Sequence, residues 1–322
     1  MKKISSLASA LSVALLVITN SLAGTLQEDF ASDPASRGWS VFGNTNLFAW
    51  DSTNQNLRVT WDSREPNSYF YRPLGTILAK DDAFTVSFDL QLSDIAVINS
   101  GGQVSVGLLN FSEATNASFS RSAANTPDLF EFDYFPDTGF GDSISASLAD
   151  MTVNDTNSHN FYFAYDSQPL LPGVTYQVTL THTAGTTNLS GQVFTNGVLL
   201  TALPYIYAGP ITDFRFDTLS ISSYHDDGFG DDILAHGTMD NFVVTLPPPP
   251  VQNLRGDFAD NQWQTQFLSR TNWTYVLERT ANFQSWKEAS PKINGTGGNL
   301  ILQDTNNILS TTRFYRVRAE HP

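Results

Sequence analysis

Apolar and polar residues alternate in short segments along most of the chain, and clusters of Gly, Asn, Asp, Ser and Pro separate these segments. A period of two residues is typical of β-strands with one buried face, and a convincing helical period is almost absent. About eleven strands before residue 250 are too many for one flat sheet, so we predict an all-β fold in which two antiparallel sheets pack as a sandwich or jelly roll. The predicted strands of this part are Trp39–Val41, Asn56–Trp61, Tyr69–Pro73, Phe84–Leu92, Gln103–Asn110, Leu129–Phe135, Asn160–Ala164, Thr175–His182, Gly191–Thr195, Phe214–Ser223 and Met239–Thr245.

The segment Tyr176–Leu200 predicts a meander of three strands. A turn at Ala184-Gly185 separates the first two strands, and Asn196-Gly197 separates the second from the third. Asn-Gly between alternating segments is the strongest short hairpin signal, because both residues accept positive φ. The pattern of this segment resembles the meander of laminin-G-like and concanavalin A-like sandwiches, which implies a large sandwich of that kind.

Four prolines, Pro247–Pro250, follow directly after the last strand of the sandwich. Proline has no N–H for a central strand and favours an extended spacer of roughly 3 Å per residue. We therefore expect a large sandwich at 24–246, a linker at 247–250 and a small β module at 251–322. The module resembles immunoglobulin-like or fibronectin-like C-terminal modules of secreted bacterial proteins, which implies attachment or spacing without catalysis. Its predicted strands are Trp263–Leu268, Tyr275–Thr280, Ser285–Glu288, Asn299–Gln303 and Arg313–Arg318.

Residues 1–23 have the features of a secretory signal peptide. Lys2 and Lys3 precede an apolar run, and Ser21 and Ala23 supply small residues before the expected cut. The apolar run is too short to remain as a membrane span, and no later stretch reaches about 20 uninterrupted apolar residues. The chain also has no cysteine, which excludes disulfides, thiolate metal sites and a cysteine nucleophile. We expect a secreted or cell-surface/periplasmic bacterial protein.

The charge of the chain is unevenly distributed. Residues 25–250 hold 26 acidic and 7 basic side chains, whereas residues 251–322 hold 6 acidic and 8 basic ones. The acidic excess repels phosphate backbones and anionic lipid surfaces, so we expect no binding to nucleic acid or membrane. Neutral polysaccharides and divalent cations are compatible with this charge.

The stretch Phe130–Asp142, FEFDYFPDTGFGD, places four carboxylates around an apolar strand. In a strand, Glu131 and Asp133 share one face, and Phe132 and Tyr134 share the other. Two carboxylates about 7 Å apart repel each other, so they need solvent, a cation or a shared proton. A solvated acidic strand without any ligand is the alternative that the residues alone leave open.

The same stretch resembles the metal loop of legume and other L-type lectins. Calcium prefers six to eight hard oxygens from carboxylates and carbonyls on a turning loop, which this stretch can supply. The family has a histidine ligand for a transition metal where this chain has Ser147, so calcium is the expected metal, and no organic cofactor is expected. The metal ligands implied by the resemblance are Glu131, Asp133, the carbonyl of Phe135, Asp137 and Asp142.

A second resemblance involves the same residues. EFDYFPD is similar to the ExDxxE strand of laminarinase-type and lichenase-type glucanases, which implies Glu131 as nucleophile and Asp133 as its assistant. The general acid of that family falls on Phe135 or Pro136, and Asp137 is the nearest acid. Retaining hydrolysis needs a second carboxyl about 5–5.5 Å away, so catalysis by this strand stays an alternative hypothesis.

Two further acidic features are candidates for cation binding. The chain resembles carbohydrate-binding sandwiches that begin with EDF and end with DNFVV, in which the two ends meet and hold a structural calcium ion. This resemblance implies a second metal site at Asp29 and Asp240. The Gly-rich segment HDDGFGDD at 225–232 is either another cation loop or an exposed flexible loop.

Aromatic residues are abundant, and most of them are expected in the core. Stacking on sugar rings is the functional alternative for those on an exposed sheet face. The sequence SYFYRPL places Tyr69 and Tyr71 on one face and Phe70 on the other, with Arg72 beside them. The predicted ligand-binding residues are Trp50, Trp61, Tyr69, Tyr71 and Arg72.

The features above are best united by a secreted, non-catalytic, lectin-like protein that binds polysaccharide or another glycan and carries a calcium site. The first alternative is a glycan hydrolase or lyase that uses Glu131. The second is a structural surface or adhesion protein. The histidines show no HExxH spacing and no serine elbow accompanies them, which excludes the common zinc and serine hydrolase motifs.

Overall fold

The computed structural model describes residues 24–97, 102–117, 119, 128–136, 141–151, 159–186, 188–207, 213–225, 233–259, 262–305 and 312–321. These residues divide into a large unit that ends at Pro248 and a small unit that begins at Pro249. The boundary falls among the four prolines 247–250. In this described part of the chain, no helix is long and apolar enough to cross a membrane.

Antiparallel strands build the large unit, and its described helical segments are single turns. Its elements are β1 (Thr25–Glu28), η1 (Pro34–Arg37), β2 (Ser40–Phe42), η2 (Thr45–Leu47), β3 (Phe48–Asp51), β4 (Asn56–Asp62), β5 (Ser68–Leu78), β6 (Phe84–Val97), β7 (Val104–Leu109), α1 (Phe111–Ala114), β8 (Leu129–Phe135), β9 (Ser143–Met151), β10 (His159–Asp166), β11 (Thr175–His182), β12 (Asn188–Thr195), β13 (Val198–Tyr207), β14 (Phe216–Ser223) and β15 (Ile233–Thr245).

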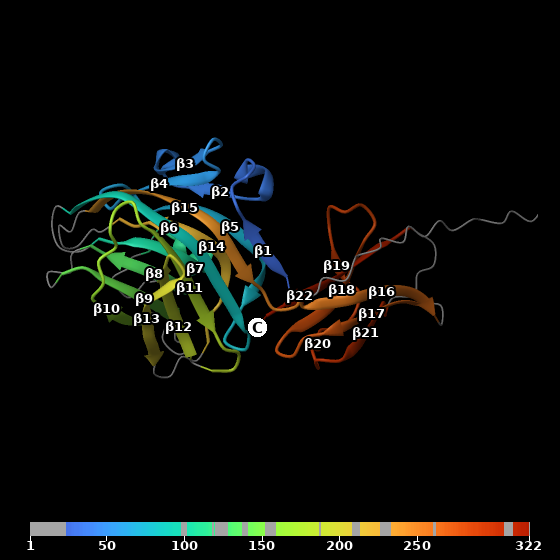
Figure 1. Ribbon diagram of the computed structural model, residues 1–322. Coiled ribbons are helices and arrows are strands. Elements are labelled where there is room, and N and C mark those ends of the chain that lie inside the picture. Colours follow the sequence, from blue (N-terminus) through green and yellow to red (C-terminus); the bar gives the residue numbers. More distant parts are fainter. Residues whose placement is uncertain are drawn as a thin grey trace, which may run out of the picture. The chain divides into compact units, whose positions relative to one another are not determined.

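Two sheets of the large unit pack face to face (Figure 1). The eight-stranded sheet has the order β13-β12-β11-β6-β15-β4-β3, with β1 also paired to β15. The seven-stranded sheet has the order β10-β9-β8-β7-β14-β5-β2. This confirms the predicted all-β sandwich. The predicted Asn-Gly turn lies between β12 and β13, where Asn196 and Gly197 have φ of 50° and 74°.

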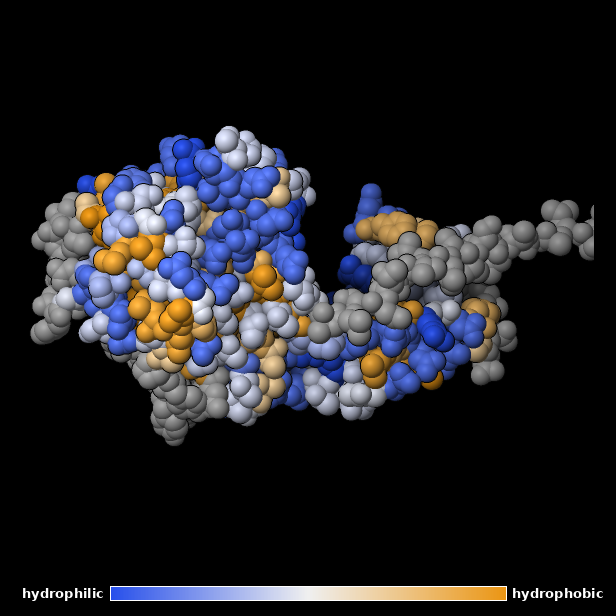
Figure 2. Space-filling view, viewed as in Figure 1, coloured by the Kyte–Doolittle hydropathy of each residue, from blue (hydrophilic) through white to orange (hydrophobic). Residues whose placement is uncertain are grey.

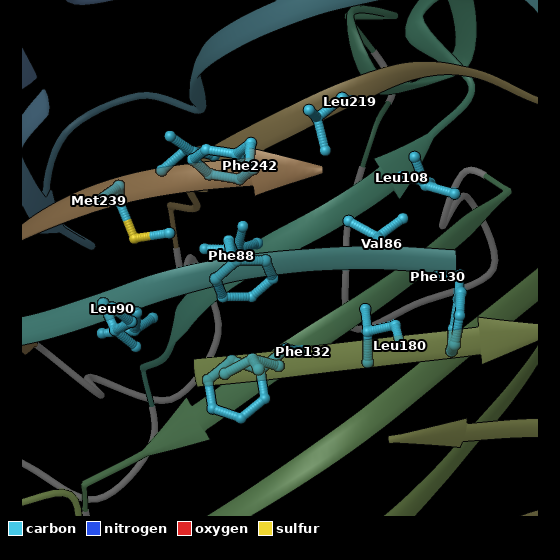
Figure 3. Packing of buried hydrophobic residues seen from close by; sticks show 14 of the residues in the cluster. Val86, Phe88, Leu90, Leu108, Phe130, Phe132, Leu180, Leu219, Met239 and Phe242 are labelled. Carbon is cyan, nitrogen blue, oxygen red and sulfur yellow. The ribbon is translucent and has the colours of Figure 1, made fainter. Parts of the chain in front are cut away.

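One apolar core fills the space between the two sheets. Phe88 and Phe242 of the eight-stranded sheet stack with ring centroids 5.4 Å apart, and Phe88 meets Phe132 of the seven-stranded sheet edge-on at 6.1 Å. Figure 3 shows these rings converging with aliphatic side chains from both sheets. Each fully buried side chain of this size stabilises the fold by about 1.5–3 kcal/mol relative to exposure. The outer faces of the sheets are therefore left for other roles.

The two ends of the large unit meet in the eight-stranded sheet. Thr25 pairs with Thr245, and Glu28 pairs with Phe242. Glu28 is buried, and its carboxylate accepts hydrogen bonds from the backbone N–H of Phe30 at 2.9 Å and from the Trp39 indole at 2.8 Å. These bonds hold β1 and the segment after it against the sandwich.

The small unit contains two short sheets, with strand orders β16-β17-β21 and β19-β18-β20, and β22 also pairs with β18. Tyr275 and Phe267 are buried in this unit, with ring centroids 5.0 Å apart. On the face shown in Figure 2, apolar residues of both units lie in small groups among hydrophilic ones. The strands are β16 (Val251–Ala259), β17 (Gln262–Ser269), β18 (Thr274–Thr280), β19 (Lys287–Glu288), β20 (Ile293–Asn294), β21 (Asn299–Gln303) and β22 (Phe314–Glu320).

Candidate functional site

Glu131 and Asp133 lie on the face of β8 that points away from the core. Phe130, Phe132 and Tyr134 alternate with them and belong to the core between the sheets, as the strand period predicts. Both acidic residues are nevertheless buried, with 0% exposure. Their oxygens therefore need hydrogen-bond donors, because an unpaired buried charge is strongly unfavourable.

Serines flank this acidic pair on the neighbouring strands. In register, Asp133 lies between Ser105 of β7 and Ser145 of β9, and Glu131 lies between Gly107 and Ser147. β14 continues these rows beyond β7. We call the buried polar residues of this outer face the serine face: Ser105, Glu131, Asp133, Ser143, Ser145, Ser147, Ser220 and Ser222.

Glu131 reaches across β7 to hydroxyl groups at the end of β14. Its Oε1 accepts hydrogen bonds from Tyr224 at 2.6 Å and from Ser222 at 3.4 Å. Gly107 lies between Glu131 and β14 in register and has no side chain to obstruct this reach. A Cβ atom at position 107 would lie 2.2 Å from the carbonyl oxygen of Phe130. Glycine is therefore required where the carboxylate crosses.

Asp133 is held by the nearer strand. Its Oδ1 accepts a hydrogen bond from Ser105 at 2.5 Å. On β9, the hydroxyls of Ser145 and Ser147 are 3.3 Å apart. The hydroxyl of Ser143, also buried, has no hydrogen-bond partner in the part of the chain that the structure describes. The serine face thus holds two carboxylates in fixed positions and retains hydrogen-bonding capacity at one end.

Aromatic residues continue this outer face from β14 toward β2. The buried ring of Tyr69 meets Tyr224 edge-on, with centroids 5.9 Å apart. Beyond Tyr69 lie three more accessible rings, Phe42, Tyr71 and Phe111, which we call the aromatic strip. Tyr71 stacks on Phe111 at 4.1 Å, and Phe42 meets Phe111 edge-on at 6.1 Å. Phe42 is 38% exposed, so the strip is open to solvent where the acidic pair is not.

The short helix α1 fixes Phe111 in the strip. The backbone N–H of Phe111 donates to Asp217 at 3.0 Å, and the side chain of Asn110 caps the helix through the N–H of Glu113 at 3.4 Å. The Glu113 carboxylate accepts from the N–H of Asp128 at 2.8 Å, and burial raises the pKa of Glu113. Two segments distant in sequence, at Asp128 and Asp217, therefore help to determine where this ring lies.

Among the described residues, the expected metal ligands do not come together as one site. Glu131 and Asp133 share a face, while Asp137 lies outside the described residues. Asp142 is half-buried near the Tyr134 phenol, and burial together with the charge of Asp142 raises the pKa of Tyr134 to about 12. Phe135 is half-buried at the end of β8. Among described residues, no three His, Asp or Glu side chains are arranged to hold a metal ion.

The second expected metal pair, Asp29 and Asp240, lies where the ends of the unit meet. Asp29 accepts a hydrogen bond from Arg37 at 2.7 Å, which lowers the pKa of Asp29. Burial, with the charges of Asp89, Asp29 and Glu28, raises the pKa of Asp240. The negative charge of Asp29 thus acts on Asp240, but Asp29 already forms an ion pair with the Arg37 guanidinium.

The five residues predicted to bind ligand do not form one surface. Trp61 is a core residue with 0% exposure, so the prediction that it binds ligand is wrong. The alternation of β4 directs it inward with Leu57 and Val59. Trp50 packs against the same core and donates its indole N–H to the Phe30 carbonyl at 2.9 Å.

The other three predicted ligand residues belong to β5. Tyr69 and Tyr71 share the outer face, as predicted, and Phe70 is in the core. Tyr69 is buried and donates its hydroxyl to the Ala114 carbonyl at 3.0 Å, which leaves Tyr71 as the accessible member. Arg72 lies 3.8 Å from the buried Glu28 carboxylate, and burial lowers the pKa of Arg72.

Of the Gly-rich acidic segment 225–232, only His225 is described. Its backbone N–H donates to Asn67 at 2.7 Å, so the segment starts from a fixed point. On the opposite sheet, a groove of about 270 Å³ is lined by Arg58, Thr60 and His236, among others. His236 contacts Asp94 there at 2.7 Å.

Sequence reasoning missed Phe42, Phe111, Tyr224 and the serines of the outer face. A signal for the serines exists: they recur at every second position in SISAS (143–147) and SIS (220–222), opposite apolar residues. Strand period then places them on one face away from the core. No comparable signal pairs Tyr224 with Glu131, because 93 residues separate them.

No protein-family model matches the sequence, and no curated protein matches it. Among solved structures, the chain is similar to alginate lyase Aly36B, with 11% identity, a TM-score of 0.43, and coverage of 71% of this chain and 99% of that one. It is similar to an endo-β-1,4-glucuronan lyase from the fungus Trichoderma reesei, with 10% identity, a TM-score of 0.39, and coverage of 65% and 87%. It is similar to a Lotus tetragonolobus seed lectin, with 12% identity, a TM-score of 0.44, and coverage of 70% and 100%.

Legume lectins and glycan lyases thus occur together among the similar structures. At these identities and scores they carry no statement about activity, ligand or metal, and the architecture rests on the sheets described above.

Proposed function

We propose that the large unit binds a glycan at the aromatic strip and that the protein is a non-catalytic, lectin-like protein. The observation that carries this proposal is the ring arrangement itself. Phe42, Tyr71 and Phe111 lie in contact on an outer sheet face, with Phe42 exposed and Tyr71 and Phe111 half-buried. Aromatic faces offer the apolar faces of sugar rings a large contact area, and fixed polar groups nearby supply orientation.

The residues behind the strip support it by keeping it rigid. The ring centroid of Tyr69 lies 5.8 Å from that of Phe42 and 5.9 Å from that of Tyr224. Tyr224 is hydrogen-bonded to the buried Glu131. A ligand that binds such a surface loses less free energy to ordering of side chains, because the rings already have one arrangement. The serine face is in this proposal a scaffold that positions the strip.

The proposal is tested by binding of the full-length protein to a panel of soluble and insoluble polysaccharides that includes alginate, xylan, cellulose and β-glucan. Tyr71→Ala and Phe42→Ala should each weaken binding at least about tenfold, since the contact of one aromatic ring with a sugar ring contributes on the order of 1–2 kcal/mol. Val198→Ala, at a 66% exposed apolar residue of β13, is the control and should bind like the unaltered protein. Equal binding by Tyr71→Ala, or no binding to any of the panel, contradicts the proposal.

A glycan hydrolase or lyase that uses Glu131 is the second candidate, and one observation favours it. The 2.6 Å hydrogen bond between Tyr224 and Glu131 joins two groups that can exchange a proton, as general acids and bases do. Both groups are buried, which favours the scaffold role. Release of reducing ends or unsaturated products by the unaltered protein, and its loss in Glu131→Gln, would replace the binding proposal with this one.

Calcium binding and export are parts of the same proposal. Calcium would be held by Asp133, the Phe135 carbonyl, Asp137 and Asp142, and oxygen donors of this kind suit it. The described members alone do not complete a site, and in this proposal Asp137 supplies a further ligand. Export depends on residues 1–23, and detection of the protein outside the cytoplasm with a new N-terminus near residue 24 would support it.

A further inference from the structure

The loop between β18 and β19 of the small unit presents an aromatic ring to solvent in a strained conformation. Phe283 is 61% exposed and has a φ of 60°. A bulky residue with positive φ is uncommon and strained, so the surrounding structure must impose it. An exposed ring gains little by burial in return.

Side-chain hydrogen bonds within the loop impose this conformation. The hydroxyl of Thr280 accepts the N–H groups of Asn282 at 3.2 Å and Phe283 at 3.1 Å. The side-chain oxygen of Asn282 accepts the N–H of Gln284 at 3.0 Å. These bonds close two short turns, and Phe283 points outward as a consequence of a loop that is locally fixed.

Two more aromatic residues and an arginine lie beside Phe283. Phe314, 38% exposed, has its ring centroid 4.0 Å from that of Phe283, and Trp286 lies 6.2 Å from it. The guanidinium carbon of Arg316 is 4.2 Å from the centroid of the Trp286 ring. We call Phe283, Trp286, Phe314 and Arg316 the Phe283 platform.

A buried carboxylate anchors the platform from below. Glu278 is 6% exposed and contacts Arg316 at 2.7 Å and Arg318 at 2.8 Å. Arg318 also contacts Glu288 at 2.7 Å. The arginine over Trp286 is thus held in place, and the ion pairs that hold it contain groups of both signs. The rim offers hydrogen bonds without a net charge of one sign.

We infer that the Phe283 platform is a carbohydrate contact site of the small unit, which takes the apolar face of pyranose rings of a neutral glycan. Two exposed rings, Phe283 and Phe314, beside the half-buried Trp286 and fixed polar neighbours match the chemistry of a sugar, which has one apolar face and a rim of hydroxyls. A stable protein interface buries about 800 Å² per partner and involves roughly 20–30 residues, far more than this platform offers. The mixed charges of the rim favour a neutral ligand over an anionic one.

The test uses the full-length protein carrying Tyr71→Ala, so that the site proposed on the large unit is already weakened. Retention on microcrystalline cellulose, chitin and insoluble β-1,3-glucan is measured before and after loss of a platform ring. Phe283→Gly is the informative change, because it removes the ring and also relieves the positive φ, so the fold is kept. Phe314→Ala removes the neighbouring ring, which β22 supplies, and leaves the loop of Phe283 unchanged. Phe258→Ala, at a 54% exposed phenylalanine of β16 in the same unit, is the matched control.

Retention on at least one of these polysaccharides should fall at least about fivefold with Phe283→Gly and with Phe314→Ala, and should be unchanged with Phe258→Ala. Unchanged retention of the Phe283→Gly protein, or no retention of the Tyr71→Ala protein on any of the three, overturns the inference. So does sedimentation that shows self-association of the protein abolished by Phe283→Gly, since the platform would then bind a second copy. If Tyr71→Ala alone binds like the unaltered protein while Phe283→Gly lowers retention, the proposal for the large unit fails and the inference for the small unit stands, so the two proposals fail separately.

Discussion

Tyr224, the residue after β14, donates its phenolic hydrogen to Glu131 of β8 at 2.6 Å across the intervening strand β7. The acceptor is a fully buried carboxylate, so loss of this donor removes the shorter of the hydrogen bonds that Tyr224 and Ser222 donate to it. Tyr224→Phe should therefore lower the free energy of unfolding of the large unit by about 1–3 kcal/mol, measured by urea denaturation.

The control for this change is Tyr71→Phe. Tyr71 is half-buried in the aromatic strip, and removal of its hydroxyl should change the free energy of unfolding by less than about 0.5 kcal/mol. If Tyr224→Phe were as stable as the unaltered protein while Tyr71→Phe behaved as expected, Glu131 would have to be satisfied without Tyr224.

Gly107 should tolerate no side chain. A Cβ there would lie 2.2 Å from the Phe130 carbonyl oxygen and 2.6 Å from the Glu131 Cα, both backbone atoms that can shift only with the strand. Gly107→Ala should destabilise the large unit by about 3 kcal/mol or more, measured by urea denaturation. Gly298→Ala, whose Cβ would have its nearest neighbour at 3.5 Å, should cost far less. Similar losses in both proteins would contradict the close approach of β7 and β8.

Much of the fold could be predicted from the sequence because local patterns specify it. The bounds of β8 and β11 agree with the predicted strands, and both segments alternate clearly. β9 was not predicted, because in SISASLADM small serines stand where a strand usually has β-branched or aromatic residues. β16 was missed as well, since its mostly exposed, polar sequence follows directly after the prolines.

The site was less predictable, for two different reasons. Trp61 could have been placed correctly, because Leu57 and Val59 on the same strand already mark its face as the core. The bond from Tyr224 to Glu131 depends instead on which strands are neighbours in the sheet, and the order β8-β7-β14 does not follow the order of the sequence. A pattern along one strand does not encode that order.

Asp213 should make stability depend on acidic pH. Burial raises the pKa of Asp213. Hydrogen bonds from Arg215 and from the N–H groups of Lys80 and Phe214 lower the pKa by more than burial raises it, so it lies below the ordinary 3.8. A carboxyl group whose pKa is lower in the folded state stabilises that state at pH values above its pKa in the unfolded chain. This stabilisation is lost as the pH falls toward and through the pKa of the folded state. In calorimetry from pH 5 down to about 3, Asp213→Asn should lose less stability than the unaltered protein.

The comparison for Asp213 is an exposed aspartate of the small unit. Asp257→Asn should keep the acid dependence of the large unit unchanged. If Asp213→Asn and the unaltered protein lost stability in parallel as pH falls, the contacts to Arg215 and Lys80 would not favour the ionised carboxylate.

Calcium binding is predicted at a site that includes Asp142, which is close enough to Tyr134 to raise its pKa, and Asp137, which lies outside the described residues. Calcium at 100 times its Kd should stabilise the large unit by about 2.7 kcal/mol, and a chelator should reverse this. Asp142→Asn should abolish the rise in Tm, whereas Asp94→Asn, at an exposed carboxylate that contacts His236, should leave it intact. A rise that survives Asp142→Asn and disappears in Asp240→Asn would assign the ion to the pair Asp29 and Asp240 instead. No change in Tm at sub-millimolar free calcium would remove calcium from both sites and leave hydroxyl donors such as Tyr224 and Ser105 to compensate the carboxylates of β8.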